Sequence, residues 1–125
     1  MGDVMRGWLS ILFYFSISLC IFDALLYFNV INVERGIGSS MYPTLDGGDV
    51  LLCIKWFDYK VGDIVTFKAP SYAEFYADGE RVHYITHRII GKEGPCYITK
   101  GDNNPRPDPY CVRKEDIICK VVLWI

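Results

Sequence analysis

The chain has 125 residues, of which 51% are hydrophobic and 22% are charged, and its formal net charge is -2. This length suits one domain, and the apolar content excludes a disordered chain while fitting a globular domain joined to a membrane segment. The sequence contains no run of basic residues. It therefore argues against nucleic-acid binding, which requires a clustered positive surface.

The first feature along the chain is an apolar segment that runs from residue 8 to residue 33 and contains one acid, Asp23. At about 1.5 Å of rise per residue, it is long enough to cross the roughly 30 Å hydrocarbon core of a bilayer. Bulky residues follow Ala24 where a signal-peptide cleavage site needs small ones, so we expect an uncleaved transmembrane anchor over residues 1–34. Asp23 is costly inside a membrane. It either meets a polar partner or lies near the interface.

The remainder, residues 35–125, has the pattern of short β-strands separated by turns. Runs of β-branched and aromatic residues predict strands at residues 50–54, 64–68, 82–91, 97–99 and 117–125. An aromatic-rich loop over residues 71–76 is followed by a predicted tight turn at Asp78-Gly79. Helical periodicity is absent after residue 34. We therefore predict a mainly β domain, a small folded-over sheet or partial barrel, preceded by one transmembrane helix.

Five cysteines occur, and none of them has the C-x-x-C spacing of a zinc site, so we expect no metal. Cys20 lies in the apolar segment. In an oxidising compartment the other four, Cys53, Cys96, Cys111 and Cys119, can form two disulfides in three pairings that the sequence does not rank. Buried, reduced thiols are the alternative.

A turn with the sequence GSSMYPTL follows the apolar segment at residues 38–45. Glycine makes such a turn adaptable and proline stiffens it, so the turn can present the hydroxyl of Ser40 to a substrate. A serine hydroxyl is a poor nucleophile until a neighbouring base takes its proton. The interpretation of Ser40 therefore depends on a base elsewhere in the chain.

Two histidines, His83 and His87, lie in one predicted strand and are the available bases. Asp102 and Asp108 lie in later turns, and either can orient an imidazole as the third member of a triad. The order serine, histidine, aspartate permits acyl-transfer chemistry. Each residue taken alone also fits an ordinary structural role.

Four boxes in order resemble the motifs of type I signal peptidases: GSSMYPTL followed by Gly48-Asp49, GDIV at 62–65, HRIIG at 87–91 and TKGDNN at 99–104. The resemblance covers roughly residues 36–122, and an N-terminal anchor fits the family as well. It implies a membrane-bound serine endopeptidase that cleaves signal peptides from secreted preproteins. A non-catalytic, membrane-anchored β-domain that binds partners remains the alternative.

In that family the serine directly before the methionine is the nucleophile, which implies Ser40. The bacterial branch uses a lysine base where this chain has His87. The resemblance thus implies the serine–histidine branch of the ER, archaea and sporulation, with His87 rather than His83 as general base. That branch has an essential aspartate six residues beyond the box aspartate, which implies Asp108, with Asp102 in support. Prolines flank Asp108, so the choice between the two acids stays open.

The resemblance also bears on substrate binding. Some bacterial members carry an oxyanion-holding serine where this chain has Gly38, so the backbone N–H of Ser40 is the expected donor and Ser39 a weaker candidate. We expect an extended substrate on a strand edge, with small P1 and P3 side chains in shallow apolar pockets. The candidates to line these pockets are Met41, Ile37, Tyr84 and Ile85.

The implied partners are preprotein signal peptides and the lipid bilayer, with no cofactor. The expected location is a single-pass membrane protein whose catalytic domain lies on the extracytoplasmic or ER lumenal side. The ER enzymes of the family work as complexes, and whether this chain needs partner subunits stays open.

Overall fold

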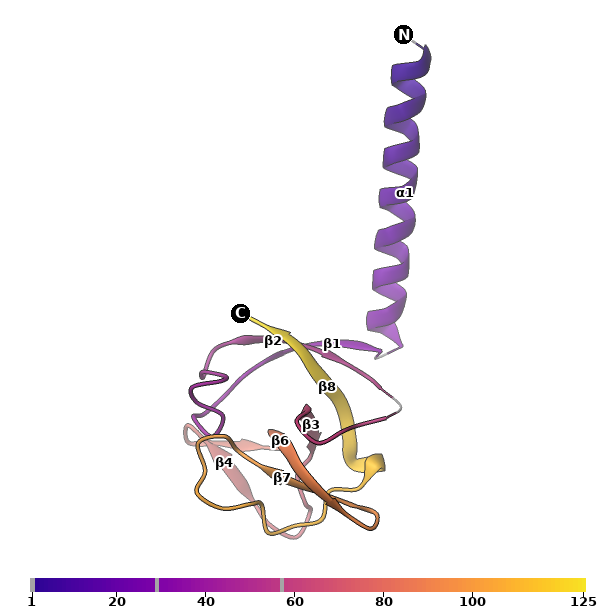
Figure 1. Cartoon of the computed structure of the whole chain (residues 1–125). Coiled ribbons are helices and arrows are strands. Elements are labelled where there is room, and N and C mark those ends of the chain that lie inside the picture. Colours follow the sequence, from indigo (N-terminus) through magenta and orange to yellow (C-terminus); the bar gives the residue numbers. More distant parts are fainter. Residues whose placement is uncertain (1, 29, 57) are drawn as a thin grey trace. The chain divides into compact units, whose positions relative to one another are not determined.

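The computed structural model describes residues 2–28, 30–56 and 58–125 of the chain, which Figure 1 shows as a ribbon. It separates into two compact units, the first ending at Ile31 and the second formed by Asn32–Ile125. The first unit holds one helix, α1 (Gly2–Tyr27), which is long and apolar enough to cross a membrane. None of the described helix residues is buried. This all-round exposure of apolar side chains suits a lipid environment.

The strand β1 (Ile31–Arg35) begins within the residues that we expected to belong to the anchor, and the sequence had not predicted it. Its β-branched residues, Ile31 and Val33, favour a pleated strand over continued helix. The helix has already ended at Tyr27. The apolar segment of the sequence is therefore shared between a helix and the first strand.

The second unit is built on a six-stranded sheet with the strand order β1-β2-β8-β3-β6-β7. The other strands of this sheet are β2 (Val50–Ile54), β3 (Ile64–Lys68), β6 (Tyr84–Glu93), β7 (Cys96–Lys100) and β8 (Ile117–Trp124). β2 with β8, β8 with β3, β3 with β6 and β6 with β7 are all antiparallel pairs. In the part of the chain that the structure describes, the sheet does not close into a barrel. The prediction of a mainly β, partly open sheet behind one apolar helix is confirmed.

A separate two-stranded hairpin is formed by β4 (Phe75–Ala77) and β5 (Glu80–Val82). Its tight turn lies at Asp78-Gly79, as predicted, and both residues have positive φ angles, 51° and 82°. Two positive φ angles are what a two-residue type I′ hairpin requires, and Asp-Gly is among its preferred pairs. The predicted aromatic loop is thus partly strand, because β4 begins at Phe75.

The predicted single strand over residues 82–91 is correct from Tyr84 onward but wrong at its start. β5 ends at Val82 and β6 begins at Tyr84, with His83 in a bend between them. The first strand pairs within the hairpin and the second joins the main sheet, so the chain must change direction between them. His83 and His87, which were predicted to lie in one strand, are therefore separated by this bend. A short 3-10 helix, η1 (Lys114–Asp116), precedes β8.

Two hydrophobic clusters fill the two sides of the main sheet, because successive strand residues point to opposite faces. One cluster contains Met41, Leu45, Leu51, Cys53, Ile64, Cys119 and Val121. The other contains Tyr59, Val65, Phe67, Ile89, Tyr97, Val112 and Ile117. The turn over residues 38–45, which carries Ser40, contributes Met41 and Leu45 to the first cluster, whereas the strand that carries His87 contributes Ile89 to the second.

Two disulfides join distant parts of the second unit, so the alternative of reduced thiols does not hold in this structure. Cys53–Cys119 links β2 to β8, and Cys96–Cys111 links the start of β7 to the segment before η1. Cys20, in α1, is free. These bonds select one of the three pairings that the sequence left open.

We expect the Cys53–Cys119 bond to stabilise the unit more than the Cys96–Cys111 bond. Its sequence separation is 66 residues against 15, and a longer closed loop restricts the unfolded chain more, by about 1 kcal/mol for this ratio. Replacing each pair by two alanines should lower the free energy of unfolding by about 2–5 kcal/mol, with the larger loss for the Cys53/Cys119 pair. Chemical denaturation in detergent, followed by tryptophan fluorescence, measures both losses. An equal or reversed order would contradict the expectation.

Candidate active site

The turn that carries Ser40 lies between β1 and β2 and is anchored on both sides of the serine. Met41 and Leu45 bury their side chains in the core, and the N–H of Leu45 donates to the carbonyl of Met41 at 3.0 Å. The N–H of Tyr42 donates to the carbonyl of Ser39 at 3.1 Å. Ser40 itself remains partly exposed. The turn is therefore held rigidly while its hydroxyl stays accessible.

His87 lies on β6, directly opposite Val65 of β3, and is 6% exposed. Its ring meets the ring of the fully buried Phe67 at a centroid distance of 6.3 Å, in an edge-to-face arrangement. The Nε2 atom of His87 is 3.1 Å from the Oγ of Ser40, and its Nδ1 atom is 2.6 Å from Oδ2 of Asp108. The structure thus brings together a hydroxyl, an imidazole and a carboxylate in a hydrogen-bonded chain.

Asp108 is held in place by β7 although it lies in a proline-rich loop. The hydroxyl of the buried Thr99 donates to Oδ2 of Asp108 at 2.7 Å, and the N–H of Asp108 donates to the carbonyl of Thr99 at 2.8 Å. The Asp108 side chain is 8% exposed. Burial, and then the negative charge of Asp108, raise the pKa of the nearby Tyr110. Thr99 was not among the predicted site residues.

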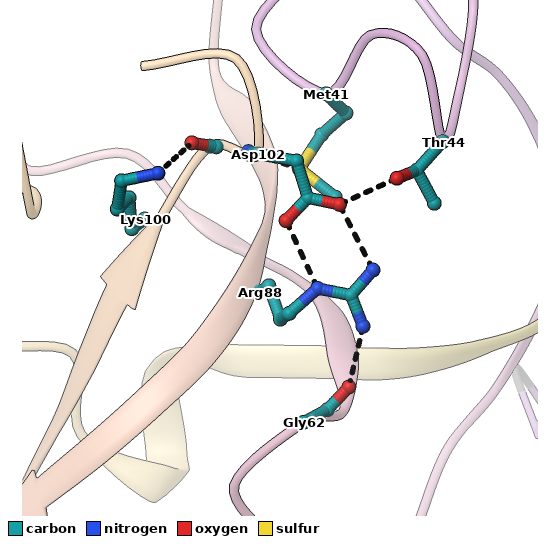
Figure 2. Close-up of polar contacts among 7 residues, drawn as sticks. Met41, Thr44, Gly62, Arg88, Lys100 and Asp102 are labelled. Atoms are coloured by element: carbon teal, nitrogen blue, oxygen red, sulfur yellow. Dashed lines mark hydrogen bonds and ion pairs between the residues drawn. The ribbon is translucent and has the colours of Figure 1, made fainter. Parts of the chain in front are cut away.

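Asp102 forms a network with Arg88 and Thr44, which Figure 2 shows. Its two carboxylate oxygens accept from Nε and Nη2 of Arg88, each at 2.9 Å, and Oδ2 also accepts from the hydroxyl of Thr44 at 2.6 Å. Arg88 Nη1 donates to the carbonyl of Gly62 at 2.9 Å. Because Asp102 contacts the guanidinium and the hydroxyl of Thr44, the acid that lies beside the imidazole is Asp108.

The bidentate pairing also sets the charge state of both partners. The hydrogen bonds from Arg88 hold the pKa of Asp102 below its ordinary value, with further lowering from the Thr44 hydroxyl, while burial opposes this. The same hydrogen bonds raise the pKa of Arg88. Bidentate pairs between a guanidinium and a carboxylate combine charge with fixed geometry. Through the hydrogen bond from Thr44 to Asp102, this pair therefore holds the turn that carries Ser40 against β6.

Asn103 holds the backbone on either side of the Ser40 side chain, and sequence reasoning had not singled it out. Its N–H donates to the carbonyl of Ser40 at 2.8 Å, and its Nδ2 donates to the carbonyl of Ser39 at 3.0 Å. Gly101 permits this approach, since a Cβ there would lie 2.6 Å from the Ser40 carbonyl oxygen. The consecutive GDNN residues were the available signal. Their individual roles depend on contacts with residues some sixty positions earlier in the chain.

A cleft of about 1100 Å³ opens beside this chain of hydrogen bonds. Ser40, His87 and Asp108 line it, as do the four predicted substrate-contacting residues Ile37, Met41, Tyr84 and Ile85. Ile37 and Tyr84 are exposed, whereas Met41 is buried in the core and offers only part of its surface. The exposed His83 lines the same cleft, and among the described residues the ring that hydrogen-bonds to Ser40 is that of His87.

Glu34, Cys53 and Cys119 place three potential metal ligands within 4.8 Å of one another. Both sulfurs are committed to the disulfide, which removes the thiolates that a metal would require. Burial raises the pKa of Glu34, and the hydrogen bond from Thr66 partly offsets this. The donor set therefore does not fit a metal site while the disulfide is intact.

Residues 5–98 match a protein-family model described as signal peptidase, peptidase S26. The chain belongs to this family. The comparisons with curated proteins and with solved structures gave no match. The family assignment supports a membrane-bound peptidase in general terms, and α1 is a helix able to span the membrane. The matched range ends before Asp102 and Asp108, so the family match does not extend to either acid. The different positions of the two acids in the site follow from their contacts in the structure.

We expect Asp102→Asn to destabilise the fold in a pH-dependent manner. The folded-state pKa of Asp102 lies below its ordinary value of 3.8, so the pair stabilises the protein above that pH. This contribution is lost as the pH falls through the folded-state pKa. At pH 7 the free energy of unfolding of the variant should be about 1–3 kcal/mol below that of the wild type. Its difference from the wild type should shrink as the pH is lowered past 3.8.

Urea denaturation at a series of pH values measures this difference. Asp58→Asn, at an exposed position, is the matched control and should track the wild type throughout. A destabilisation by Asp102→Asn that is the same at pH 7 and at pH 3 would show that the ion pair is not its cause.

Proposed function

We propose that the chain is a membrane-anchored serine endopeptidase that removes signal peptides from secreted preproteins. The observation that carries this proposal is the hydrogen-bonded chain from Ser40 through His87 to Asp108, which opens on a cleft in a member of the signal peptidase family. Because a carboxylate only accepts hydrogen bonds, the short contact to Asp108 favours the tautomer with the proton on Nδ1 of His87. Nε2 is then free to accept the proton of Ser40.

In this mechanism Ser40 attacks the scissile carbonyl while His87 takes its proton as general base. Asp108 holds the imidazole in the productive tautomer and stabilises the imidazolium that forms. His87 then gives the proton to the departing amine, which leaves an acyl-enzyme on Ser40. The departing amine is the N-terminus of the mature protein, so the ester on Ser40 holds the signal peptide. Water attacks this ester, again with His87 as base, and releases the signal peptide with a free carboxylate and the regenerated Ser40 hydroxyl.

The oxyanion of the tetrahedral intermediate would be held by the backbone N–H of Ser40. This N–H shares one planar peptide group with the carbonyl of Ser39. That carbonyl accepts from both Tyr42 and Asn103, so the orientation of the whole peptide plane is fixed before substrate arrives. Preorganised donors of this type are usually the largest single contribution to acyl-transfer catalysis. Gly38 adds no side-chain donor, and the hydroxyl of Ser39 is the weaker candidate.

The serine–histidine branch of the family is the one that these residues fit. His87 stands where the bacterial branch has lysine, and its ring has a hydrogen-bond partner on each nitrogen. A lysine base would have no use for an acid in the position of Asp108. The contacts of Asp102 to Arg88 and Thr44 suit a structural role in the same site.

The substrate would bind in an extended conformation along β6. β7 pairs with β6 only from Arg88 onward, so within the described strands the edge of residues 84–87 that faces β7 has no strand partner. An incoming peptide can add to such an edge through main-chain hydrogen bonds. Its small P1 and P3 side chains would then contact Ile37, Tyr84, Ile85 and the accessible part of Met41.

The catalytic unit would lie on the extracytoplasmic or ER lumenal side of the membrane. Disulfides form and persist in oxidising compartments, and this unit holds two. The helix α1 would keep the site at the bilayer surface where the cleavage region of a preprotein emerges, which raises the effective substrate concentration. Lipid and preproteins are the partners that this arrangement requires, and further subunits of a signal peptidase complex are compatible with it.

Replacing Ser40 with alanine should abolish preprotein cleavage, lowering kcat by at least about 10³-fold, because the nucleophile itself is removed. The assay follows cleavage of a fluorogenic preprotein segment by the full chain in detergent micelles or vesicles. Ser39→Ala is the matched neighbour and should retain activity within about tenfold of the wild type. Cleavage by Ser40→Ala at the wild-type rate would refute the assignment of Ser40 as nucleophile, and cleavage by neither protein would favour the non-catalytic binding module.

The Asp108→Asn variant should separate the roles of the two acids. An amide at this position favours the wrong tautomer of His87, so kcat should fall by about 10²–10⁴-fold with little change in KM. Asp102→Asn should instead lower thermal stability and leave the shape of the pH–rate profile unchanged. If Asp102→Asn were the variant with the larger fall in kcat at full folding, the assignment of Asp108 would be wrong.

A further inference from the structure

The β4–β5 hairpin stands apart from the main sheet and lies along the cleft. Within the described residues it pairs with no strand of the six-stranded sheet. Six of its residues nevertheless line the cleft: Phe75, Tyr76, Ala77, Asp78, Arg81 and Val82. The proposed mechanism assigns no task to any of them. Their position raises the question of what holds the hairpin against the site.

At its tip the hairpin is bonded to the main chain just ahead of the nucleophile. The N–H of Gly38 donates to Oδ2 of Asp78 at 3.0 Å, and Gly38 lies two residues before Ser40. Gly38 has a φ of 80°, and a Cβ added there would lie 3.4 Å from the Cβ of Ala77. The tip therefore rests directly on the glycine, which has no side chain to keep it away.

At its base the hairpin contacts the segment that carries the triad acid. The ring of Phe75 meets that of Tyr110 at 5.8 Å in an edge-to-face arrangement, and Tyr110 follows Asp108 by two residues. Tyr110 in turn packs on Phe67 at 6.0 Å, and Phe67 is the ring that contacts His87. One hairpin thus touches the segments that carry both ends of the hydrogen-bonded chain.

We infer that the β4–β5 hairpin is a strap across the cleft and that Asp78 is a positioning residue, which fastens the strap to the segment leading into Ser40. This inference rests on the proposed function, since it assigns the strap to the same catalytic site. Gly36 and Gly38 make the segment before Ser40 intrinsically adaptable. The hydrogen bond from the Gly38 N–H to Asp78 restricts the rotation of the backbone at Gly38. Small displacements of a reacting group are costly, because productive attack requires near-contact geometry.

The chain offers variants that remove the bond without disturbing the hairpin. Glycine and asparagine both tolerate the positive φ of position 78 in a type I′ turn. Asp78→Gly deletes the acceptor, whereas Asp78→Asn keeps an amide oxygen that can accept from Gly38. Glu80→Gln, two residues along the same hairpin, removes a carboxylate that does not line the cleft, and it serves as the matched charge control.

Two measurements on the full chain in detergent micelles test the inference. Hydrogen exchange of a proteolytic fragment covering residues 36–40 should quicken in Asp78→Gly, by about tenfold for one amide, and return to the wild-type rate in Asp78→Asn. In preprotein cleavage, kcat/KM should fall about five- to tenfold in Asp78→Gly with an unchanged Tm, recover in Asp78→Asn and stay normal in Glu80→Gln.

The two readouts separate the strap from the proposed activity. Faster exchange in Asp78→Gly would support the hydrogen bond between Gly38 and Asp78. If cleavage nevertheless did not depend on Ser40, the catalytic role of the site would be overturned, and the positioning role of Asp78 with it. Unchanged exchange and unchanged kcat/KM in Asp78→Gly would overturn the strap while leaving Ser40-dependent cleavage standing. A defect in Asp78→Asn as large as that in Asp78→Gly would also overturn it, because the negative charge and not the hydrogen bond would then be responsible.

Discussion

Two neighbouring residues of β6 hold the candidate active site together from opposite faces of one strand. His87 bonds to Asp108, and Arg88 bonds to Asp102. Because successive side chains in a strand point to opposite faces, one strand anchors both ends of the loop that runs from residue 102 to residue 108. Between these ends the same loop supplies Asn103, whose main chain and side chain donate hydrogen bonds to the carbonyls of Ser40 and Ser39. The position of Ser40 relative to His87 therefore follows from the register of β6, transmitted through a loop that is fixed at both ends.

This arrangement explains why the sequence predicted part of the site and not the rest. Ser40 and His87 were implied by the resemblance of the turn and of the HRIIG box to family motifs, and the structure brings their side chains within hydrogen-bond distance. The choice between Asp102 and Asp108 is different. Both residues follow β7 in the chain. Which of them meets the imidazole depends on the face of β6 that each one reaches. Asn103 was missed for a related reason, because its contacts are with a turn far away in the chain.

The fold shows the same division between local and long-range information. The helix, four of the predicted strands and the Asp78-Gly79 turn depend on short-range periodicity and turn chemistry, which a sequence carries plainly. The bend at His83 is not visible in this way, because the residues on both sides of it favour strand. It arises since β5 pairs in the hairpin while β6 pairs with β3. The disulfide pairing likewise depends on which strands become neighbours, and here β2 and β8 do.

The hydrogen bond between Ser40 and His87 joins two parts of the domain that rest on different cores. The turn that carries Ser40 packs its Met41 and Leu45 side chains into the cluster that contains the Cys53–Cys119 disulfide. His87 rests on Phe67, which belongs to the other cluster. A small unit of this kind buries a limited core, and disulfides commonly supply what such a core lacks. Any shift of one cluster against the other would lengthen the 3.1 Å contact between the hydroxyl and the imidazole. The Arg88–Asp102 pair joins β6 to Thr44 in the turn that carries Ser40 and opposes that shift, so side chains outside the cleft help to keep the hydroxyl within reach of the imidazole.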